Sequence, residues 1–454
     1  MASTNKFRLR GLAAGALLAA GLCGAGGAGA VTLEEAYQAA LKNDPVFRMR
    51  YYENESGKEN AILGRSQLLP QVSASHTVNQ NRVDREYTAK DAFGREQFIQ
   101  DYPKYLSRSS VVQLRQSLFN MDAIQRYRQG KVQTAQAQEA YEAGADEVSV
   151  RLVTTYMDAL FAEDQLALAR AQRDMHIEQT KVNKFLFERG EGTRTDMLET
   201  QARLDVAEAA LVEAQDNVTA ARNTLAGVIG MDPGTLDQIG ANFRPVTLDV
   251  STYAEWQQLA LRQNNTLAAL RLAVENSRLE IGRNKAGHLP RVDLIASYGK
   301  NLSETLTVAG QETLNRSIGL QVNIPIYSGG AINAQTRQAA ANHGRVQAEL
   351  DARINETMVE LRRAYDLVQS SGRKIDALVK AVDSGKELVK ATEQSIKGGV
   401  RINLDLLNAQ SQLVTSQRDL AQARYSYLVG LMRLRAASGT MAPDAVREIS
   451  GFFR

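Results

Sequence analysis

Cysteine, tryptophan and proline are scarce in this chain. Its 454 residues include one cysteine, one tryptophan and eight prolines, and aromatic residues make up 6%. A disulfide framework is excluded, because one cysteine cannot form a bridge within the chain. The remaining composition is rich in alanine, glutamine, glutamate, leucine and arginine, which is typical of long helices or coiled coils.

Long apolar runs are missing beyond the first thirty residues, so no membrane-spanning helix is predicted there. The first thirty residues have a basic start at residues 6–10, an apolar run that ends at Leu22, and small residues that end at Ala30. This order is that of a secretory signal peptide. We therefore expect residues 1–30 to be removed on export, with cleavage near Ala30 and a mature chain that begins near Val31.

Cys23 offers another interpretation of this leader, since a cysteine at the end of an apolar run can carry a lipid. A lipid-attachment cysteine normally follows a small residue, whereas Leu22 precedes Cys23. We favour the cleaved leader, which leaves the mature chain without cysteine and without thiol chemistry.

Net charge is also absent from the expected mature chain. The full sequence has 54 lysines and arginines against 51 aspartates and glutamates, and the leader contains Lys6, Arg8 and Arg10 but no acidic residue. Removing these three bases leaves 51 charges of each sign. A nucleic-acid partner is not expected, because it would need a basic stripe.

Catalytic and metal-binding motifs are not found in the sequence. The histidines, His76, His176, His288 and His343, lack the spacing of metal ligands. The segment 190–192 has two glycines but not the third of a dinucleotide fingerprint, and no phosphate loop or nucleophile motif occurs. We expect neither an enzyme nor a cofactor.

The chain contains one internal repeat, with matching residues first 220, then 208 and finally 209 positions apart. The matches include Thr32 with Thr252, Glu35 with Glu255, Leu69-Pro70 with Leu289-Pro290, residues 117–124 with residues 325–332, and Gly190 with Gly399. We predict two tandem copies, residues 31–240 and 241–454. Each copy is expected to contain a helix, a strand, a loop, a strand, a long helix and another helix.

The predicted strands alternate apolar with polar or small residues. The alternation is clear at 292–298 and 318–326 and weaker at 112–118, with polar external loops expected at about 83–107 and 302–314. A period of two gives a sheet one apolar and one polar face. Such a face covers a core in a soluble sheet and meets lipid in a membrane barrel, and alternation alone does not decide between them.

The predicted helices are unusually long. Residues 122–188 and 331–397 contain no proline, and a continuous helix of that length would extend roughly 100 Å. The helices that follow have a strict seven-residue apolar repeat, which predicts a left-handed supercoil. Its positions are Met197, Leu204, Leu211, Val218 and Leu225, with Thr200, Ala207, Ala214, Ala221 and Val228 three residues later, and Leu406, Leu413, Leu420, Tyr427 and Leu434 in the second copy.

Four strands per chain are too few to close a membrane barrel, which needs about eight. Open sheet edges are not tolerated in lipid. If these strands span a membrane, two, three or four chains must therefore share one barrel in a closed cyclic assembly.

In order and spacing, several motifs together resemble the TolC family of outer-membrane efflux proteins. The resemblance covers Val31 to about Met441, and its carriers are Leu69-Pro70-Gln71, residues 287–290, Pro325 to Gly330, Gly190 to Asp196, Arg401 to Gln410 and Ala423 to Leu428. It implies a mixed α+β membrane protein: a homotrimer with one twelve-stranded β-barrel, continued by a long α-helical coiled-coil barrel across the periplasm.

The same resemblance implies a passive exit channel in the cell outer membrane, in contact with outer-membrane lipid. Its partners would be a periplasmic adaptor and an inner-membrane ABC or proton-driven transporter. Protein secretion of type I and small-molecule efflux both remain open, and the absence of a lipid anchor slightly favours secretion. The alternative is a soluble periplasmic coiled-coil adaptor or scaffold, which has no reason to carry duplicated amphipathic strands.

The resemblance further implies a periplasmic gate at the turns between the paired helices. Thr195 and Asp196 would meet Arg401, and Asp405 would belong to an acidic ring that filters by charge. The sequence departs from the family pattern at Asn408, where a second acidic residue is expected, and at Ile396, where a gating tyrosine is expected. The alternative interpretation is that Asp196 and Asp405 are helix N-caps.

Overall fold

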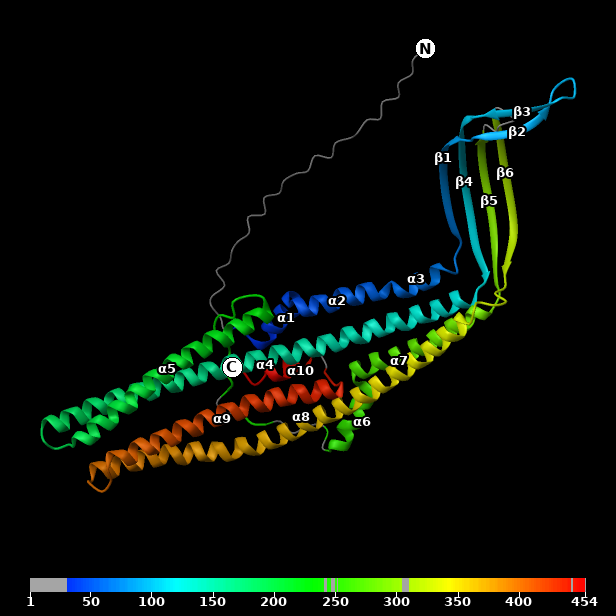
Figure 1. The fold of residues 1–454 in the computed structure, drawn as a ribbon. Helices are drawn as coiled ribbons and strands as arrows, with labels where there is room; N and C mark the ends of the chain where they lie inside the picture. The colour runs from blue at the N-terminus through cyan, green and yellow to red at the C-terminus, as the bar shows by residue number, and fades with distance from the viewer. Residues whose placement is uncertain are drawn as a thin grey trace, which may run out of the picture.

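The computed structural model describes residues 31–240, 243–245, 250, 252–303, 310–441 and 444–453. The expected leader, residues 1–30, lies outside the described residues. The protein is elongated, with a four-stranded sheet at one end and two helical hairpins whose turns lie at the other (Figure 1).

Apart from one short strand hairpin in the first, the two repeats contribute their described helices and strands in the same order. The first contains α1 (Leu33–Asn43), α2 (Pro45–Lys58), α3 (Asn60–Ser66), β1 (Gln71–Arg82), β2 (Arg85–Lys90), β3 (Glu96–Asp101), β4 (Lys104–Phe119), α4 (Met121–Glu188) and α5 (Arg194–Ile229). The second contains α6 (Tyr253–Gln263), α7 (Asn265–Lys285), the 3₁₀ turn η1 (Ala286–His288), β5 (Arg291–Ser303), β6 (Gln311–Asn323), α8 (Ala331–Lys397) and α9 (Asn403–Ser438), followed by α10 (Asp444–Ser450). The tandem repeat is therefore confirmed, while its exact boundary at 240/241 stays a prediction.

The repeat extends to the helix caps. Thr32 and Thr252 each form a capping box with the glutamate three residues later, so both first helices begin in the same way. The long-helix hairpins turn at Gly190 and Gly399, whose φ angles are 75° and 72°. These left-handed conformations favour glycine because it has no Cβ.

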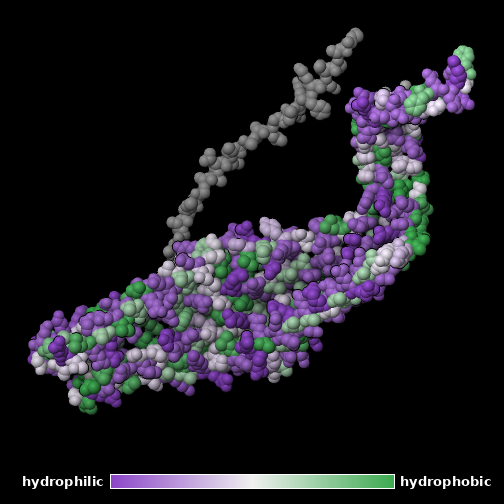
Figure 2. Space-filling view, in the orientation of Figure 1, coloured by the Kyte–Doolittle hydropathy of each residue, from purple (hydrophilic) through white to green (hydrophobic). Residues whose placement is uncertain are grey.

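The strands form one antiparallel sheet in the order β1-β4-β5-β6. The register places apolar side chains on one face, where they are exposed or half-buried; this face carries Val72, Ala74, Val112, Leu114, Leu294, Tyr298, Ile318, Leu320 and Val322. Figure 2 shows hydrophobic residues along the β6 side of the sheet, towards the helices. The opposite face is polar and internally bonded, with Arg115 paired to Asp293 at 2.5 Å and Ser109 bonded to Asn301 at 2.6 Å.

The expected loop at 83–107 is partly wrong. A second hairpin, β2–β3, occupies most of it, and β4 begins at Lys104. Arg85 and Asp101 pair at the base of this hairpin, and Asp91 accepts hydrogen bonds from the backbone of Phe93 and Arg95 at its tip. Local polar contacts therefore order a segment without an apolar face. The loop expected at 302–314 is shorter, because β5 reaches Ser303 and β6 starts at Gln311.

The long helices pack as two antiparallel hairpins, α4 with α5 and α8 with α9, which meet along α4 and α9. The predicted heptads are confirmed at their small positions: Ala207 and Ala214 are buried in α5. In α9 the small residues three positions after each predicted heptad residue are also expected in the seam, and Ala409, Ser416, Ala423, Gly430 and Ala437 are buried there. None of the described helices has a stretch apolar enough to cross a membrane.

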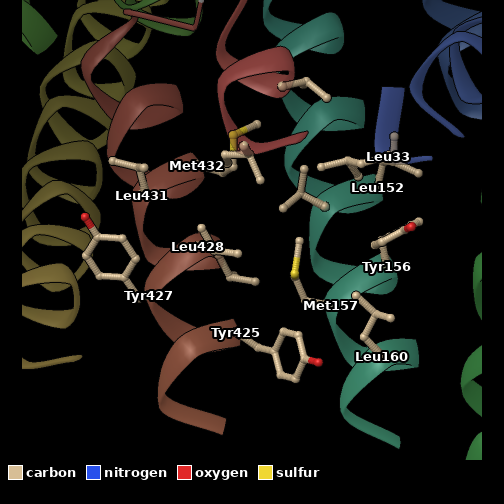
Figure 3. Close-up of a cluster of buried hydrophobic side chains, with 14 of the residues drawn as sticks. Leu33, Leu152, Tyr156, Met157, Leu160, Tyr425, Tyr427, Leu428, Leu431 and Met432 are labelled. Carbon is tan, nitrogen blue, oxygen red and sulfur yellow. The ribbon is translucent and has the colours of Figure 1, made fainter. Parts of the chain in front are cut away.

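The main apolar core lies at the waist of the molecule, where α4 meets α9. Met157 of α4 points towards Leu428 of α9, while Tyr156 lies on the side of α4 nearer Leu33 of α1 (Figure 3), and these four side chains are at most 1% exposed. The Tyr156 hydroxyl donates to the Val31 carbonyl at 2.8 Å and accepts from the backbone N–H of Asp237 at 3.1 Å. The core thus joins the two repeats to each other and to the segment between them.

At this waist α1 ends where α2 begins, and α6 ends where α7 begins, so that the two helices of each pair meet end to end. The Asn43 amide donates to the Ile229 carbonyl at the end of α5, and the Asp44 carboxylate accepts from Val46 and Phe47 at the start of α2. In the second repeat one residue does both: Asn264 caps the backbone N–H of Leu267 and donates to the Ala437 carbonyl. The negative end of one helix dipole therefore meets the positive end of the next.

Asp44 and Asn264 occupy equivalent positions, but only Asp44 is charged. It is 3% exposed and pairs with Arg151 at 2.7 Å. We expect Asp44→Ala to lower the free energy of unfolding by about 1–2 kcal/mol, because the start of α2 loses its cap. Asp44→Asn keeps the cap in the manner of the second repeat and should cost less.

Denaturant titration of the two purified variants beside the wild type measures this difference. Equal midpoints for the alanine and asparagine variants would contradict the assignment of Asp44 as a cap.

Candidate functional site

The two turns at the end of the helical hairpins form the candidate site. Residues 189–193 join α4 to α5, and residues 398–402 join α8 to α9. In Figure 1 the turns lie at the end of the molecule farthest from the sheet.

In the first turn the helix cap is Thr193. Its hydroxyl accepts from the backbone N–H of Asp196 at 3.0 Å and donates to the Asp196 carboxylate at 2.6 Å. The Asp196 backbone carbonyl also accepts from Asn183 at 3.4 Å and from Thr200 at 2.9 Å. Asp196 is therefore held on its own hairpin, while the neighbouring side chain of Thr195 is exposed.

In the second turn the cap position is Ile402, whose apolar side chain cannot accept a hydrogen bond. The Arg401 guanidinium lies 4.0 Å from the Asp405 carboxylate, with about half of the arginine side chain exposed. An exposed pair of this kind contributes about 0–1 kcal/mol. It can therefore exchange partners at little cost.

The interpretation of Asp196 and Asp405 as N-caps is wrong, since the cap positions are Thr193 and Ile402. Both aspartates lie three residues later, where a negative charge favours the helix dipole. The structure brings Arg401 and Asp405 together in one turn. Thr195 and Asp196 lie on the other hairpin, so their contact with Arg401 stays a prediction.

The structure also places the two residues at which the sequence departs from the family pattern. Asn408 is exposed on α9, one turn beyond Asp405, and Ile396 is half-buried at the end of α8. Asn408 therefore shares the face of Asp405 without adding a charge.

Buried polar side chains behind the turns were not predicted as part of the site. His176, Asn183 and Thr200 are 5%, 6% and 1% exposed between α4 and α5, and Thr392 is 2% exposed at the equivalent of Asn183 in α8. A signal was present, because Thr200 stands at a heptad position that normally holds an apolar residue. Near the turns, the helices of each hairpin therefore bury polar side chains beside apolar ones such as Leu407, whereas the core at the waist is apolar.

Within the described ranges, no group of three or more histidine, cysteine, aspartate or glutamate side chains is arranged to hold a metal ion. The turns thus offer exposed charges of both signs on two helical hairpins. Such an arrangement can form and break ion pairs with a neighbouring chain.

Comparison with known proteins identifies the family to which this fold belongs. The family model described as "Outer membrane efflux protein" matches residues 36–231 and 256–440. The chain is 39% identical to the alkaline protease secretion protein AprF of Pseudomonas aeruginosa over 91% of its length and 85% of that protein. It is 36% identical to the proteases secretion protein PrtF of Dickeya chrysanthemi, covering 94% and 92% of the two chains.

A solved structure shows the same architecture. The CmeC outer membrane channel of Campylobacter jejuni superimposes with a TM-score of 0.76 at 18% identity, covering 92% of this chain and 89% of that one. At this identity the likeness concerns the fold alone.

Duplicated strand pairs, long helical hairpins and charged turns define a channel protein of the outer membrane. The chain belongs to the outer membrane efflux protein family, which confirms the resemblance to TolC proteins. It is an exit channel located in the outer membrane and extending into the periplasm, and not an enzyme. The alternative of a soluble adaptor or scaffold is thereby wrong.

His176 makes the first hairpin sensitive to pH. Its side chain is buried beside Arg203, and its Nδ1 atom has no hydrogen-bond partner among the described residues. Burial, and then the charge of Arg203, lower the pKa of His176 below its usual 6.5. The neutral form is thus favoured by folding, and its contribution to stability is complete above pH 6.5 and lost as pH falls through the lowered pKa.

We therefore expect hydrogen exchange in residues 176–205 to accelerate below about pH 6 relative to the same residues in α8 and α9. His176→Gln cannot acquire the charge and should remove the difference. An unchanged pH dependence in that variant, after correction for intrinsic exchange, would refute the role of His176.

Proposed function

We propose that three copies of the chain assemble into one duct. Each copy contributes four strands to a twelve-stranded barrel in the outer membrane and two helical hairpins to a tube through the periplasm. The observation that carries this proposal is the sheet, with its exposed apolar face, its polar face and two open edges. Lipid would cover the apolar face, and the polar face would line water.

Strand length supports this arrangement. The four strands have 12, 16, 13 and 13 residues, and a tilted strand needs about 9–11 residues to cross a bilayer. Four strands bend into only part of a closed barrel, because small barrels already need about eight. Three chains give twelve strands, the number that the family resemblance implies.

The proposed cargo is a secreted protein, and a protease is the first candidate. The two relatives above 30% identity described here are named for protease secretion. A passive duct needs an energy source at its inner end, so the proposed partners are an inner-membrane ABC or proton-driven transporter and a periplasmic adaptor. The exposed turns of the hairpins are the surface that would face them.

Two further parts of the proposal concern the chain itself. Residues 1–30 are proposed to be a signal peptide removed near Ala30, which would deliver the chain to the periplasm. Residues 31–240 and 241–454 are proposed as the two repeats of one channel domain, since the linker between them packs on the waist core.

Deletion of the gene tests the cargo. We expect the medium to lose one or more secreted proteases, and the wild-type gene to restore them. Sensitivity to dyes, detergents and antibiotics should be measured in parallel. Normal secretion combined with increased sensitivity would replace protein export by small-molecule efflux.

The proposed gate joins Thr195 and Asp196 of one hairpin to Arg401 of another, with Asp405 and Asn408 around the opening. Asp405 would repeat three times around the axis, so that its carboxylates attract cations and repel one another. The exposed Arg401–Asp405 pair supports this role, because both groups are free to meet a neighbouring chain.

Combined substitution of Arg401→Ala and Asp405→Ala should raise the single-channel conductance in planar bilayers several-fold and weaken cation selectivity. Arg418 and Asp419 form an exposed pair at 3.0 Å farther along α9, and their double alanine substitution is the matched control. If both double variants conduct like the wild type, the gate assignment is wrong and the channel stands.

A further inference from the structure

Charged side chains are unevenly distributed over the apolar face of the four-stranded sheet. On this face, the half of each strand next to the helices has no charged side chain among the described residues; it carries Val72, Ala74, Val112, Leu114, Leu294, Ala296, Ile318, Leu320 and Val322. The half farther from the helices (Figure 1) carries five basic side chains and one acidic one: Arg82, Lys104, Arg108, Lys300, Arg316 and Glu312. Because the helices extend into the periplasm, this half lies towards the outside of the cell.

Three of the basic residues lie on a diagonal across neighbouring strands. Arg108 of β4 is two residues from Ser110, which faces Lys300 of β5. Lys300 is two residues from Tyr298, which faces Arg316 of β6. The three side chains therefore lie on the same face of the sheet and shift by two residues from each strand to the next.

The tilt of the strands brings this diagonal to one depth in the proposed barrel. At the outer end of the sheet, β4 pairs with β1 from Lys104 onwards but with β5 only from Ser107 onwards, so the strand ends are displaced in the direction of the diagonal. Tilted barrel strands require such a displacement. Two residues beyond each basic residue, on the outer side, an apolar side chain follows: Leu106, Leu302 and Leu314. The basic residues therefore lie within the lipid-covered surface, at the level of the outer leaflet.

The chain itself neutralises only part of this positive charge. Lys300 pairs with Glu312 at 2.6 Å. The Arg316 guanidinium lies 5.6 Å from the centre of the Tyr298 ring, and Arg108 is exposed. Neither arginine belongs to an ion pair of the described part of the sheet. Both guanidinium groups are thus available to an anion at this depth.

Like charges also face each other farther out. Arg82 lies directly opposite Lys104 at the end of the β1–β4 ladder, and both side chains are exposed. Facing like charges destabilise a strand pair. Anionic groups next to this end of the sheet would remove the repulsion.

The internal repeat keeps an arginine at the equivalent position of both strand pairs. Arg108 and Arg316 are 208 residues apart, which is the offset of the repeat in this region. An arginine on the lipid face of a barrel is destabilising at the middle of the bilayer and nearly neutral close to its surface. A negatively charged lipid headgroup turns such an arginine into a favourable contact.

We propose that Arg108 and Arg316, together with Lys300, bind the phosphate groups of the glycolipid in the outer leaflet, lipopolysaccharide. The inference rests on the proposed barrel and names the lipid that its outer half contacts. Guanidinium groups suit this ligand, because their parallel N–H donors match two phosphate oxygens. The uncharged half of the face next to the helices meets the inner leaflet, where this glycolipid is absent.

Native mass spectrometry tests the site on the assembled protein, extracted from outer membranes in mild detergent and washed free of bound lipid. Titration with short-chain lipopolysaccharide that carries its phosphates should give saturable binding. The same lipid after chemical removal of its phosphates should bind at least about tenfold more weakly, because the charge-assisted hydrogen bonds are lost.

Variants assign this difference to the two arginines. Arg108→Gln combined with Arg316→Gln should weaken binding of the phosphorylated lipid at least about tenfold and leave binding of the dephosphorylated lipid unchanged. Arg108→Lys combined with Arg316→Lys keeps the charge and should retain most of the affinity. Arg373→Gln combined with Lys380→Gln removes two exposed charges from α8, away from the sheet, and should bind like the wild type.

The outcomes separate the lipid site from the proposed duct. Equal binding of the two lipid forms by the wild type, or an unchanged affinity of the glutamine variant, would overturn the site. A preference of the wild type for phosphatidylglycerol over lipopolysaccharide would overturn the choice of lipid. In these cases a trimer on native gels leaves the duct standing, whereas a mature protein that is monomeric in the membrane would overturn both. The single glutamine variants replace the double variant if it does not assemble, and each should weaken binding of the phosphorylated lipid.

Discussion

The open edges of the sheet are the constraint on which the rest of the molecule depends. Unpaired backbone N–H and C=O groups cannot remain in hydrocarbon, where each would cost several kcal/mol. The chain has one apolar face and two unpaired edges, at β1 and β6. A single copy cannot satisfy both requirements, and the proposed shared barrel resolves this by giving the strands identical neighbours. In that assembly the helices would have to fit side by side at a spacing that the strands impose.

The helices are held together differently at the waist and near the turns. At the waist, Met157 of α4 and Leu428 and Met432 of α9 belong to one apolar core, which joins the two hairpins of one chain. Towards the turns buried polar side chains appear beside apolar ones: His176, Asn183 and Thr392 are buried there, and so is Leu407. Polar contacts can exchange partners with water or a neighbouring chain at lower cost than an apolar core. The proposed gate therefore lies where the two hairpins are held less exclusively by apolar packing.

The sequence was informative wherever the determining interactions are local and periodic. The heptads place Ala207 and Ala214 in the buried seam, and the long helices run over 121–188 and 331–397, within one residue of the prediction. It was less informative for the β2–β3 hairpin, which is ordered by polar contacts such as Arg85 with Asp101 rather than by an apolar pattern. The cap at Thr193 instead of Asp196 depends on turn geometry, which spacing alone does not define.

The two repeats differ where their environments differ. The two strand pairs keep the same register, because a slip of one residue would move the apolar side chains to the polar face. The junctions and turns are free of that restriction: Asp44 is replaced by Asn264, His176 by Gly385 and Thr193 by Ile402. Duplication therefore supplies a wall of nearly equal units, and divergence at the turns gives each chain two unlike hairpins. In the proposed gate, an acidic residue of one hairpin would therefore pair with a basic residue of the other, as Asp196 with Arg401.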